Sequence, residues 1–465
     1  MEQLLNPLLL ARIQFAFTVS FHIIFPAFTI GLASFLAMVE FLWLATKNNT
    51  FRDIYKFWVK IFAVAFGMGV VSGVTMSYQF GTNWSSFADK TANVLGPLLG
   101  YEVLTAFFLE SSFLGIMLFG WGRVSKNMHF TATCIVAGGT LLSAFWILSA
   151  NSFMQTPAGF YVQEDGRLMP TNWLDIIFNP SFPYRFLHMI TAAYLTTSFV
   201  IGGVSAFYLI TKRHIKEAKI MFFMSVLMAF FVSPIQLFIG HEHGINTMIH
   251  QPAKVAAMEG NWDHANHAPL YLFGIPNQAL EKTEYGITIP GLASWVLTGS
   301  FENPIPKLKS FAKEDIPPVF AVFWSFRVMV GIGVLMIFTG LFSAAEYARG
   351  RLYTNKFLHY LWVLMSPSGF VAILAGWFVS EIGRQPWVVY GVLRTSDGVS
   401  PAIIGPQVAW SLLCFVVIYL FVFGSGSFYV LRLISKGIIE YTEDEQFYKR
   451  GVGASVVESG LKKKL

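Results

Sequence analysis

The segment GWFVSEIGRQPW, residues 376–387, ends an apolar run that begins near residue 357. A run of about 20 apolar residues can cross the ~30 Å hydrocarbon core of a bilayer as a helix. This run ends with a carboxylate, Glu381, and a guanidinium, Arg384, between Trp377 and Trp387. The segment therefore predicts a membrane-spanning helix that carries functional charged groups at one end.

The composition of the whole chain agrees with this prediction. Of its 465 residues, 55% are hydrophobic and only 12% are charged, about half the charged fraction of a soluble domain. Nine stretches are long and apolar enough to span a membrane: 13–43, 54–82, 95–121, 128–152, 185–210, 219–240, 319–345, 357–381 and 407–434. The sequence predicts a polytopic, all-α membrane protein.

Basic residues predict the orientation of the spans. Alternate short connections hold Lys47 and Arg52, then Arg123 and Lys126, and later the lysines and arginines of 212–219 and 349–356, with the KKK tail on the same side. By the positive-inside rule this side is cytoplasmic, so we expect a periplasmic N-terminus and a cytoplasmic C-terminus. No basic patch interleaved with aromatic residues indicates nucleic-acid binding.

The spans divide the chain into four segments. Residues 1–240 hold the first six helices, 241–317 form an external segment, 318–436 hold the last three helices and 437–465 form a cytoplasmic tail. The external segment is longer than an ordinary connection, which favours a functional role. Its "HEHG" motif, 241–244, has a metal-like spacing, but in a polar loop we expect it to be solvated.

Four charged side chains lie in or at the ends of the spans: Glu102, Glu110, Arg327 and Glu381. Each charge in mid-helix costs roughly 2.5–3.5 kcal/mol on insertion, so such groups usually have a partner or a task. Arg327 alone is compatible with a buried ion pair that fixes helix packing. Two carboxylates without a cation on their own helix favour proton handling or iron binding.

Two histidines, His22 and His188, are set well within apolar helix. Taken alone, a buried histidine is more often a hydrogen-bonded core residue, and Met329 is more often a packing residue. Counting 1.5 Å per residue, however, places both histidines, Met329 and Glu381 in the outer half of the bilayer. Histidine and methionine are ligands of low-spin haem iron, and carboxylate oxygen is a less common one. Their joint placement favours a haem site.

Seven stretches that include these residues occur in order along nearly the whole chain: RIQFAFTVSFH (12–22), FGMGVVSGVTMSYQFGTNW (66–84), YEVLTAFFLESSFLG (101–115), LSAFWILSANSFMQTP (142–157), YRFLHMITAAY (184–194), FWSFRVMVG (323–331) and GWFVSEIGRQPW (376–387). Together they make the chain resemble subunit I of the cytochrome bd-type quinol oxidases, bacterial terminal oxidases that reduce oxygen without copper.

The resemblance implies three haems. His188 and Met329 look like the axial pair of a low-spin haem b that takes electrons from quinol. His22 and Glu381 look like the ligands of two high-spin haems, one of b type and one haem d, or a third haem b in its place. Members of the family differ in which of the two sites holds haem d, so both assignments stand.

Further residues gain expected roles from the same resemblance. Arg327 is similar to the arginine that stabilises the reduced low-spin haem. Arg384, one turn after Glu381, would pair with a haem propionate, because guanidinium binds carboxylate in a bidentate way. Trp377 looks like the aromatic side chain among the haems.

Proton delivery and quinol binding are implied as well. Glu102 and Glu110 resemble carboxylates tied to proton delivery, and a polar path would continue through Ser111, Ser143 and Asn151. The external segment resembles the quinol-binding Q loop, in a short form that is compatible with a cyanide-insensitive-like branch. In its AKVAAMEGNW stretch, 253–262, Lys254 would hydrogen-bond a quinol oxygen and Glu259 would accept a quinol proton. Without the family, these two would be read as solvated.

The implied activity is oxidation of quinol on the periplasmic side and reduction of O2 to water with cytoplasmic protons, which generates a membrane potential without pumping. The implied location is the bacterial inner membrane, and the implied partners are subunit II and small single-span subunits.

Two other functions compete with this one. A proton-coupled secondary transporter would use Glu102, Glu110 and Arg327 as a substrate site, but inverted repeats and Gly/Pro-broken helices, which are typical of transporters, are not evident. A two-haem b-type quinol dehydrogenase would normally show paired histidines on single helices, whereas only two histidines are well buried.

Overall fold

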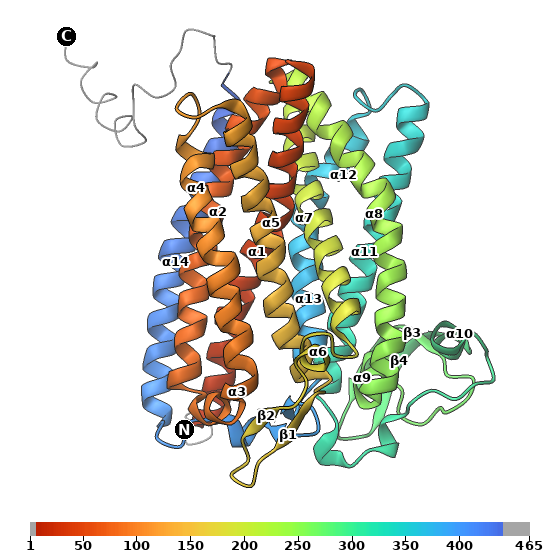
Figure 1. The fold of residues 1–465 in the computed structure, drawn as a ribbon. Helices are drawn as coiled ribbons and strands as arrows, with labels where there is room; N and C mark the ends of the chain where they lie inside the picture. Colours follow the sequence, from red (N-terminus) through yellow and green to blue (C-terminus); the bar gives the residue numbers. More distant parts are fainter. Residues whose placement is uncertain (1–5, 440–465) are drawn as a thin grey trace.

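The computed structural model describes residues 6–439 and forms a bundle of long helices (Figure 1). Within that range, nine helical segments are long and apolar enough to cross a membrane, which confirms the predicted number. Seven spans are built from α1 (Pro7–Thr46), α2 (Asn49–Thr82), α5 (Lys126–Gln155), α7 (Phe182–Ile210), α8 (Ile215–His250), α11 (Val319–Ala348) and α14 (Gly405–Lys436). The predicted tail beyond residue 439 lies outside the described residues.

The third and eighth spans are each built from more than one segment. The third consists of α3 (Ser85–Tyr101), a π-helical stretch, η2 (Glu102–Phe107), and α4 (Phe108–Phe119). The eighth consists of α12 (Lys356–Met365) and α13 (Ser368–Ile382), separated at Ser366 and Pro367. Both spans were predicted from their hydrophobic length, which does not reveal these internal breaks. Proline limits regular winding, and π turns are frequent at functional sites.

The helix α7 forms the centre of the bundle. In the most apolar 18-residue stretch of α7, 78% of the residues are buried. The corresponding share is 17% in the third span and in α14. Helix α7 packs against α1, α5, α8, α12 and α13. Gly202 permits this close packing, because a Cβ atom there would clash with the ring of Trp362. The third span and α14 therefore leave most of their surface to lipid or to other subunits.

Short elements gather at one end of the bundle (Figure 1). They are β1 (Phe160–Val162), β2 (Leu168–Pro170), α6 (Trp173–Ile177), α9 (Pro252–Glu259), β3 (Leu270–Asn277), β4 (Lys282–Ile289), α10 (Leu292–Thr298), η3 (Leu308–Ser310), η4 (Lys313–Asp315), β5 (Trp387–Val389), β6 (Leu393–Arg394) and η5 (Thr395–Gly398). The strands form three antiparallel pairs, β1–β2, β3–β4 and β5–β6. We call this the α9 end of the bundle.

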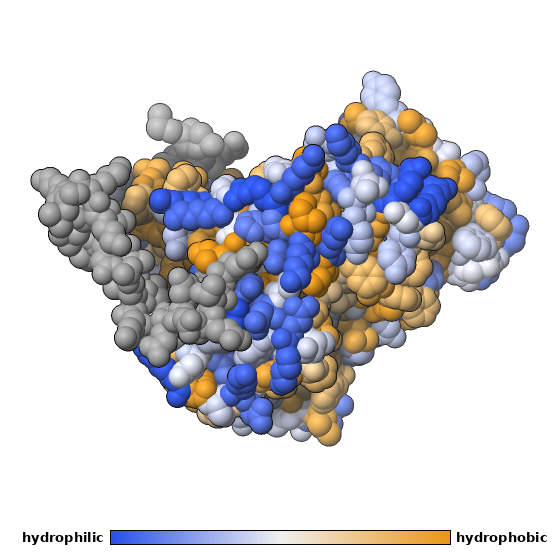
Figure 2. All heavy atoms as spheres, turned by 90° about the horizontal axis from the view of Figure 1, so that it is seen from above, coloured by the Kyte–Doolittle hydropathy of each residue, from blue (hydrophilic) through white to orange (hydrophobic). Residues whose placement is uncertain are grey.

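The opposite end carries the residues that the sequence analysis assigned to the cytoplasmic side. Figure 2 views this end and shows hydrophilic side chains gathered across it. Lys47 and Arg123, in two of its connections, and Lys216, in the first turn of α8, are exposed there. Asn48 and Ser125 cap α2 and α5 at this end by accepting backbone hydrogen bonds. The short connections therefore end the helices sharply.

One predicted boundary was wrong. The sixth span was expected to end near residue 240, with the HEHG motif in a solvated loop. Instead α8 continues through His241 and His243 to His250, and the connection begins at Gln251. Histidine and glycine have modest helix propensity, but packing against α7 keeps the helix regular. The external segment is correspondingly shorter and starts directly with α9.

Candidate functional site

Four helices place the predicted iron ligands in the half of the bundle nearer the α9 end. His188 lies in the second turn of α7, which starts at Phe182, and Met329 lies ten residues after the start of α11. Glu381 is next to last in α13. His22, on α1, is 15 residues, or about 22 Å, from Pro7. The four side chains therefore come from four different spans, but all lie in the half of the bundle nearer the α9 end.

Three of these ligands face a glycine on a neighbouring helix. A Cβ atom on Gly73 of α2 would lie 3.1 Å from the ring of His22, and one on Gly240 of α8 would lie 3.1 Å from that of His188. A Cβ atom on Gly376 of α13 would lie 2.9 Å from the sulfur of Met329. Glycine at each position therefore lets the neighbouring helix pack closely against the candidate ligand.

Hydrogen bonds orient the two histidines. The Nδ1 atom of His22 lies 3.1 Å from the hydroxyl of Ser72, which is fully buried. The side chain of Gln236 on α8 lies 3.3 Å from Nε2 of His188 and donates to the His188 carbonyl at 3.1 Å. Partners of this kind fix the ring orientation of metal-binding histidines.

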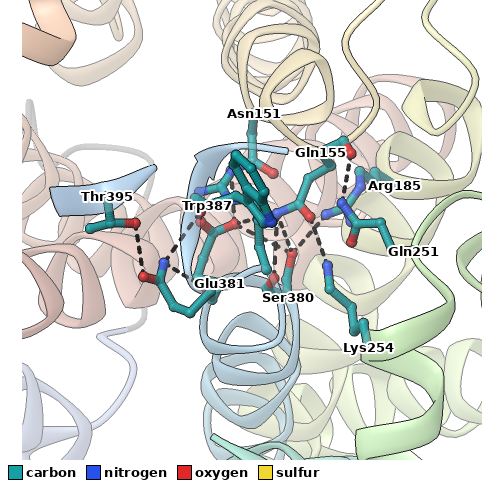
Figure 3. Close-up of polar contacts among 11 residues, drawn as sticks. Asn151, Gln155, Arg185, Gln251, Lys254, Ser380, Glu381, Trp387 and Thr395 are labelled. Atoms are coloured by element: carbon teal, nitrogen blue, oxygen red, sulfur yellow. Dashed lines mark hydrogen bonds and ion pairs between the residues drawn. The ribbon is translucent and has the colours of Figure 1, made fainter. Parts of the chain in front are cut away.

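The carboxylate of Glu381 is the centre of a buried polar network (Figure 3). Its Oε1 atom accepts hydrogen bonds from Asn151 at 3.0 Å, from Gln155 at 3.0 Å and from Ser380 at 3.3 Å. Its Oε2 atom is bound by Arg384, one turn further along. The predicted ligand is thus held by residues of α5 and α13, and Arg384, which was expected to pair with a haem propionate, pairs with Glu381 through Nη2.

Two more cations reach this network. Arg185 of α7 donates to Ser380 at 2.7 Å, and Lys254 of α9 donates to the side chain of Gln155 at 2.7 Å. With Arg384, three cations surround one carboxylate, and all three are at most 8% exposed. Three of the arginine nitrogens, Nε and Nη1 of Arg384 and Nε of Arg185, have no hydrogen-bond partner among the described residues.

This excess of buried positive charge indicates an anionic ligand. Unpaired buried charges are strongly unfavourable, so a site of this kind normally receives compensating negative groups. Burial, together with the nearby Arg185 and Arg384, holds the pKa of Lys254 well below its ordinary value. Buried guanidinium nitrogens without partners match carboxylates such as the propionates of haem.

Arg327 joins α11 to the elements at the α9 end. It donates to the carbonyls of Tyr271 at 2.9 Å, Met258 at 2.7 Å and Phe323 at 3.0 Å, and its guanidinium lies 3.2 Å from the centre of the Phe323 ring. Its hydrogen bonds therefore go to backbone oxygens in β3, α9 and α11, which orient the guanidinium two residues before Met329.

Glu259 lies at the end of α9 beside this arginine. It is 5% exposed, and its Oε2 atom has no hydrogen-bond partner among the described residues. Burial raises the pKa of Glu259, and the charge of Arg327 opposes that rise. Both residues of the predicted quinol site, Lys254 and Glu259, are thus buried, and the reading of a solvated loop was wrong for both.

The two carboxylates of the third span face α5. Ser143 donates to Glu102 at 2.9 Å, and Glu110, which is 5% exposed, packs on Gly139. The Oε1 atom of Glu110 has no partner among the described residues. Ser111 is exposed and hydrogen-bonds to its own helix, so the structure does not bring it to this path.

Trp377 lies where α1, α7 and α13 meet. It packs against a cluster that contains Ile23, Ala27 and Met189. These neighbours flank His22 and His188 in the sequence, so Trp377 lies near both histidine-bearing helices, and its place among the haems stays a prediction.

Several members of the site were missed by the sequence analysis. Arg185 lies three residues before His188 and therefore on the same face of α7. That spacing could have predicted it as a member of the site. His243 was assigned to solvent, but its ring lies 5.6 Å from that of His188. Gln155, Ser380 and Gln251 carry no signal in one sequence, because their contacts are to residues 96–226 positions away.

No group of three or more His, Cys, Asp or Glu side chains that would hold a single metal ion occurs between residues 6 and 439. The candidate ligands are spread over four helices, as they would be for groups that each take one or two protein ligands.

Comparison with known proteins gives consistent matches. Residues 10–438 match the family described as cytochrome bd terminal oxidase subunit I. The chain is 37% identical over 443 residues to a Bacillus subtilis protein named cytochrome bd ubiquinol oxidase subunit 1. The alignment covers 93% of this chain and 94% of the relative. The chain is 32% identical over 477 residues to the cytochrome bd-II ubiquinol oxidase subunit 1 of Escherichia coli, covering 88% of this chain and 93% of the relative.

A solved structure agrees. The structure of the bd oxidase from Geobacillus thermodenitrificans superimposes with a TM-score of 0.84 at 28% sequence identity, covering 93% of this chain and 99% of that chain.

Proposed function

This chain belongs to the cytochrome bd terminal oxidase subunit I family, and we propose from that premise that its four candidate ligands hold three haems. As a member of the family it is a subunit of a quinol oxidase in the bacterial inner membrane, and it acts with a subunit II on quinol and O2. His188 and Met329 are assigned to a low-spin haem b. His22 and Glu381 are assigned to two high-spin haems, one of b type and one haem d or a third haem b.

The residues present fit these groups. The haems supply electron transfer and oxygen binding at iron, and the chain supplies ligands, charge and protons. One observation supports the assignment: the positive charge around Glu381 leaves nitrogens of Arg185 and Arg384 free for carboxylates. The Glu381 network is the observation that carries the proposal, because no apolar core would keep such a charge imbalance.

Quinol oxidation is assigned to α9. Lys254 can hydrogen-bond a quinol oxygen, and Glu259 can accept a proton from the quinol hydroxyl once it is ionised. Arg327 lies between Glu259 and Met329, and it keeps a positive charge where the low-spin haem would be reduced. We assign residues 251–318 to a short Q loop, residues 6–250 and 319–436 to the haem-binding bundle, and the α9 end to the periplasm.

Proton delivery is assigned to Glu102 and Glu110. Both face α5, where Ser143 and Asn151 lie between them and Glu381. Protons taken from the cytoplasmic side and released from quinol on the periplasmic side would build a membrane potential without a pump. Small single-span subunits and subunit II would cover the poorly buried third span and α14.

The test is a reduced-minus-oxidised absorbance spectrum of the purified oxidase beside the His188→Ala variant. The wild type is expected to show low-spin haem b and high-spin haem signals, and the variant is expected to lose the low-spin signal alone. Survival of that signal would remove the axial assignment. Colourless wild-type protein would exclude the haem function and favour the transporter alternative.

A further inference from the structure

A second buried polar cluster lies at the end of the bundle opposite to α9, where α1 ends and α5 begins. The carboxylate of Glu40, on α1, is fully buried and binds two side chains of α5. Its Oε1 atom lies 2.6 Å from Nδ1 of His129, and its Oε2 atom accepts from Thr133 at 2.6 Å. The hydroxyl of Tyr55, on α2, lies 3.0 Å from that of Thr133. Ionisable groups within a span usually mark a function.

Only one of the two ring nitrogens of His129 is bound within this cluster. Its Nε2 atom is buried and has no hydrogen-bond partner among the described residues. The residue lies in the first turn of α5, next to the aqueous end of the bundle. A purely structural link between α1 and α5 would need only the hydrogen bond between His129 and Glu40. The free nitrogen is therefore a place where the ring can gain a proton from the aqueous side.

Aromatic and charged groups enclose the cluster. The Trp121 ring is edge-on to His129 at 4.8 Å, and the ammonium of Lys56, on α2, lies 5.2 Å from the Trp121 ring. Asp53, on α2, is also buried, and Cys134 follows Thr133 on α5. Lys126 lies over the ring of Trp43 at 5.1 Å. None of these groups binds Nε2 of His129, which stays available for a proton.

Polar side chains continue from this cluster along one face of α5. Counting from His129, they lie 4, 11, 14 and 22 residues further on, which at about 100° per residue keeps them within an arc of about 80°. The face consists of His129, Thr133, Thr140, Ser143 and Asn151.

Carboxylates from three other elements reach the same face. Glu40 binds at its start, Glu102 accepts from Ser143 at 2.9 Å, and Glu381 accepts from Asn151 at 3.0 Å. Glu110 packs on Gly139, within the gap between Thr133 and Thr140, and has a free oxygen. The face therefore runs from the Glu40 cluster to the Glu381 network, and proton transfer across its remaining gaps requires chains of buried water.

We propose that Glu40 and His129 are the proton-loading pair of this face. A proton from water binds at Nε2 of His129, and the proton on Nδ1 passes to Glu40, so one proton enters and one is stored. The neutral ring then turns away from Glu40, releases its Nε2 proton to water and takes another from water at Nδ1, which restores the first tautomer. Glu40 then gives its proton toward Glu110 and Glu102, and its carboxylate returns to the charged form. This inference rests on the proposed function, because it supplies the protons that oxygen reduction consumes.

The experiment uses the complete oxidase complex in liposomes. Glu40→Gln keeps the hydrogen-bonding shape but cannot carry a proton. We expect it to lower steady-state oxygen reduction and dye-detected proton uptake by about 100-fold, in the range found for proton-transfer groups. Anaerobic reduction of the haems by quinol should keep its wild-type rate. Glu346→Gln is the matched control: Glu346 is also fully buried at this end, is bound by Arg349 and Arg351, and lies off the α5 face.

A second variant separates proton transfer from helix packing. His129→Ala should lose turnover, and added imidazole should restore part of it by replacing the missing ring. Normal turnover in Glu40→Gln, or a loss that also slows anaerobic haem reduction and lowers haem content equally, would overturn the proposal in favour of a structural clamp. Either result would leave the proposed function intact, since that function is tested by the spectrum and quinol oxidation of the wild type.

Discussion

Lys254 of α9 donates a 2.7 Å hydrogen bond to Gln155 at the end of α5. The amide nitrogen of Gln155 in turn donates to Glu381 at 3.0 Å. The segment assigned to quinol is thus two hydrogen bonds from the carboxylate assigned to iron. Gln155 is the only described side chain to which Lys254 hydrogen-bonds. A substitution of Gln155 should therefore alter both the segment assigned to quinol and the Glu381 carboxylate.

Replacing Gln155 by leucine should weaken both quinol binding and the Glu381 site. The variant leaves the buried Lys254 and the side chain of Glu381 each without one partner, which costs about 1–3 kcal/mol per unsatisfied group. We expect a higher KM for quinol, an altered high-spin haem spectrum and a lower melting temperature. Gln163→Leu, an exposed position, serves as the control. A change confined to KM would show that Gln155 does not position Glu381.

Substitutions of Arg327 should separate geometry from charge. The guanidinium group of Arg327 donates hydrogen bonds to three carbonyls. Lysine keeps the charge but cannot reproduce this arrangement. We expect Arg327→Lys to lower stability by about 1–3 kcal/mol with little change in the midpoint potential of the low-spin haem. Arg327→Gln should lower that potential by about 60 mV, a tenfold change in the equilibrium of a one-electron couple. Redox titration and thermal unfolding of both variants check this. Equal potentials in the two variants would contradict an electrostatic role.

Glu259 predicts a pH dependence of quinol oxidation. Burial raises the pKa of this carboxyl, so between the ordinary and the raised value the folded chain holds a proton that the unfolded chain releases. Stability should therefore fall as pH rises through this window. Activity should rise over the same window, because only the ionised carboxylate accepts a proton. Glu259→Gln should lower the rate about 100-fold and flatten the profile, whereas Glu302→Gln, which is exposed, should change neither. An unchanged profile in Glu259→Gln would assign the proton acceptor elsewhere.

Removal of the Glu381 carboxylate should release one high-spin haem and leave the low-spin haem in place. In Glu381→Ala the cations Arg185, Lys254 and Arg384 lose their only anionic partner among the described residues. Pyridine haemochrome analysis is expected to show a lower haem content, with the His188-dependent spectrum retained. Glu284→Ala, which removes a carboxylate of β4 paired with Lys282, should keep all haems. Full haem content in Glu381→Ala would show that this residue is not a ligand.

The sequence predicted the spans because hydrophobic length is a local property. The Glu381–Arg384 pair could also be predicted, since residues three apart share a helix face. The contacts of Gln155 with Glu381 and Lys254 join positions 226 and 99 apart, and no pattern in one sequence encodes them. The sequence analysis ended α8 too early because a histidine-rich turn looks polar, although packing against α7 keeps it helical.

The π-helical stretch at Glu102–Phe107 has a consequence for the winding of the third span. In a regular α-helix, residues 102 and 110 would point about 80° apart. One π turn takes in an additional residue, which brings that separation to roughly 20° and lets both carboxylates point at α5. The phase between them is thus set by the wide backbone turn: winding the same residues as a regular α-helix would swing Glu110 aside, whereas deleting one residue between 103 and 107 would give a regular helix that keeps the separation of roughly 20°.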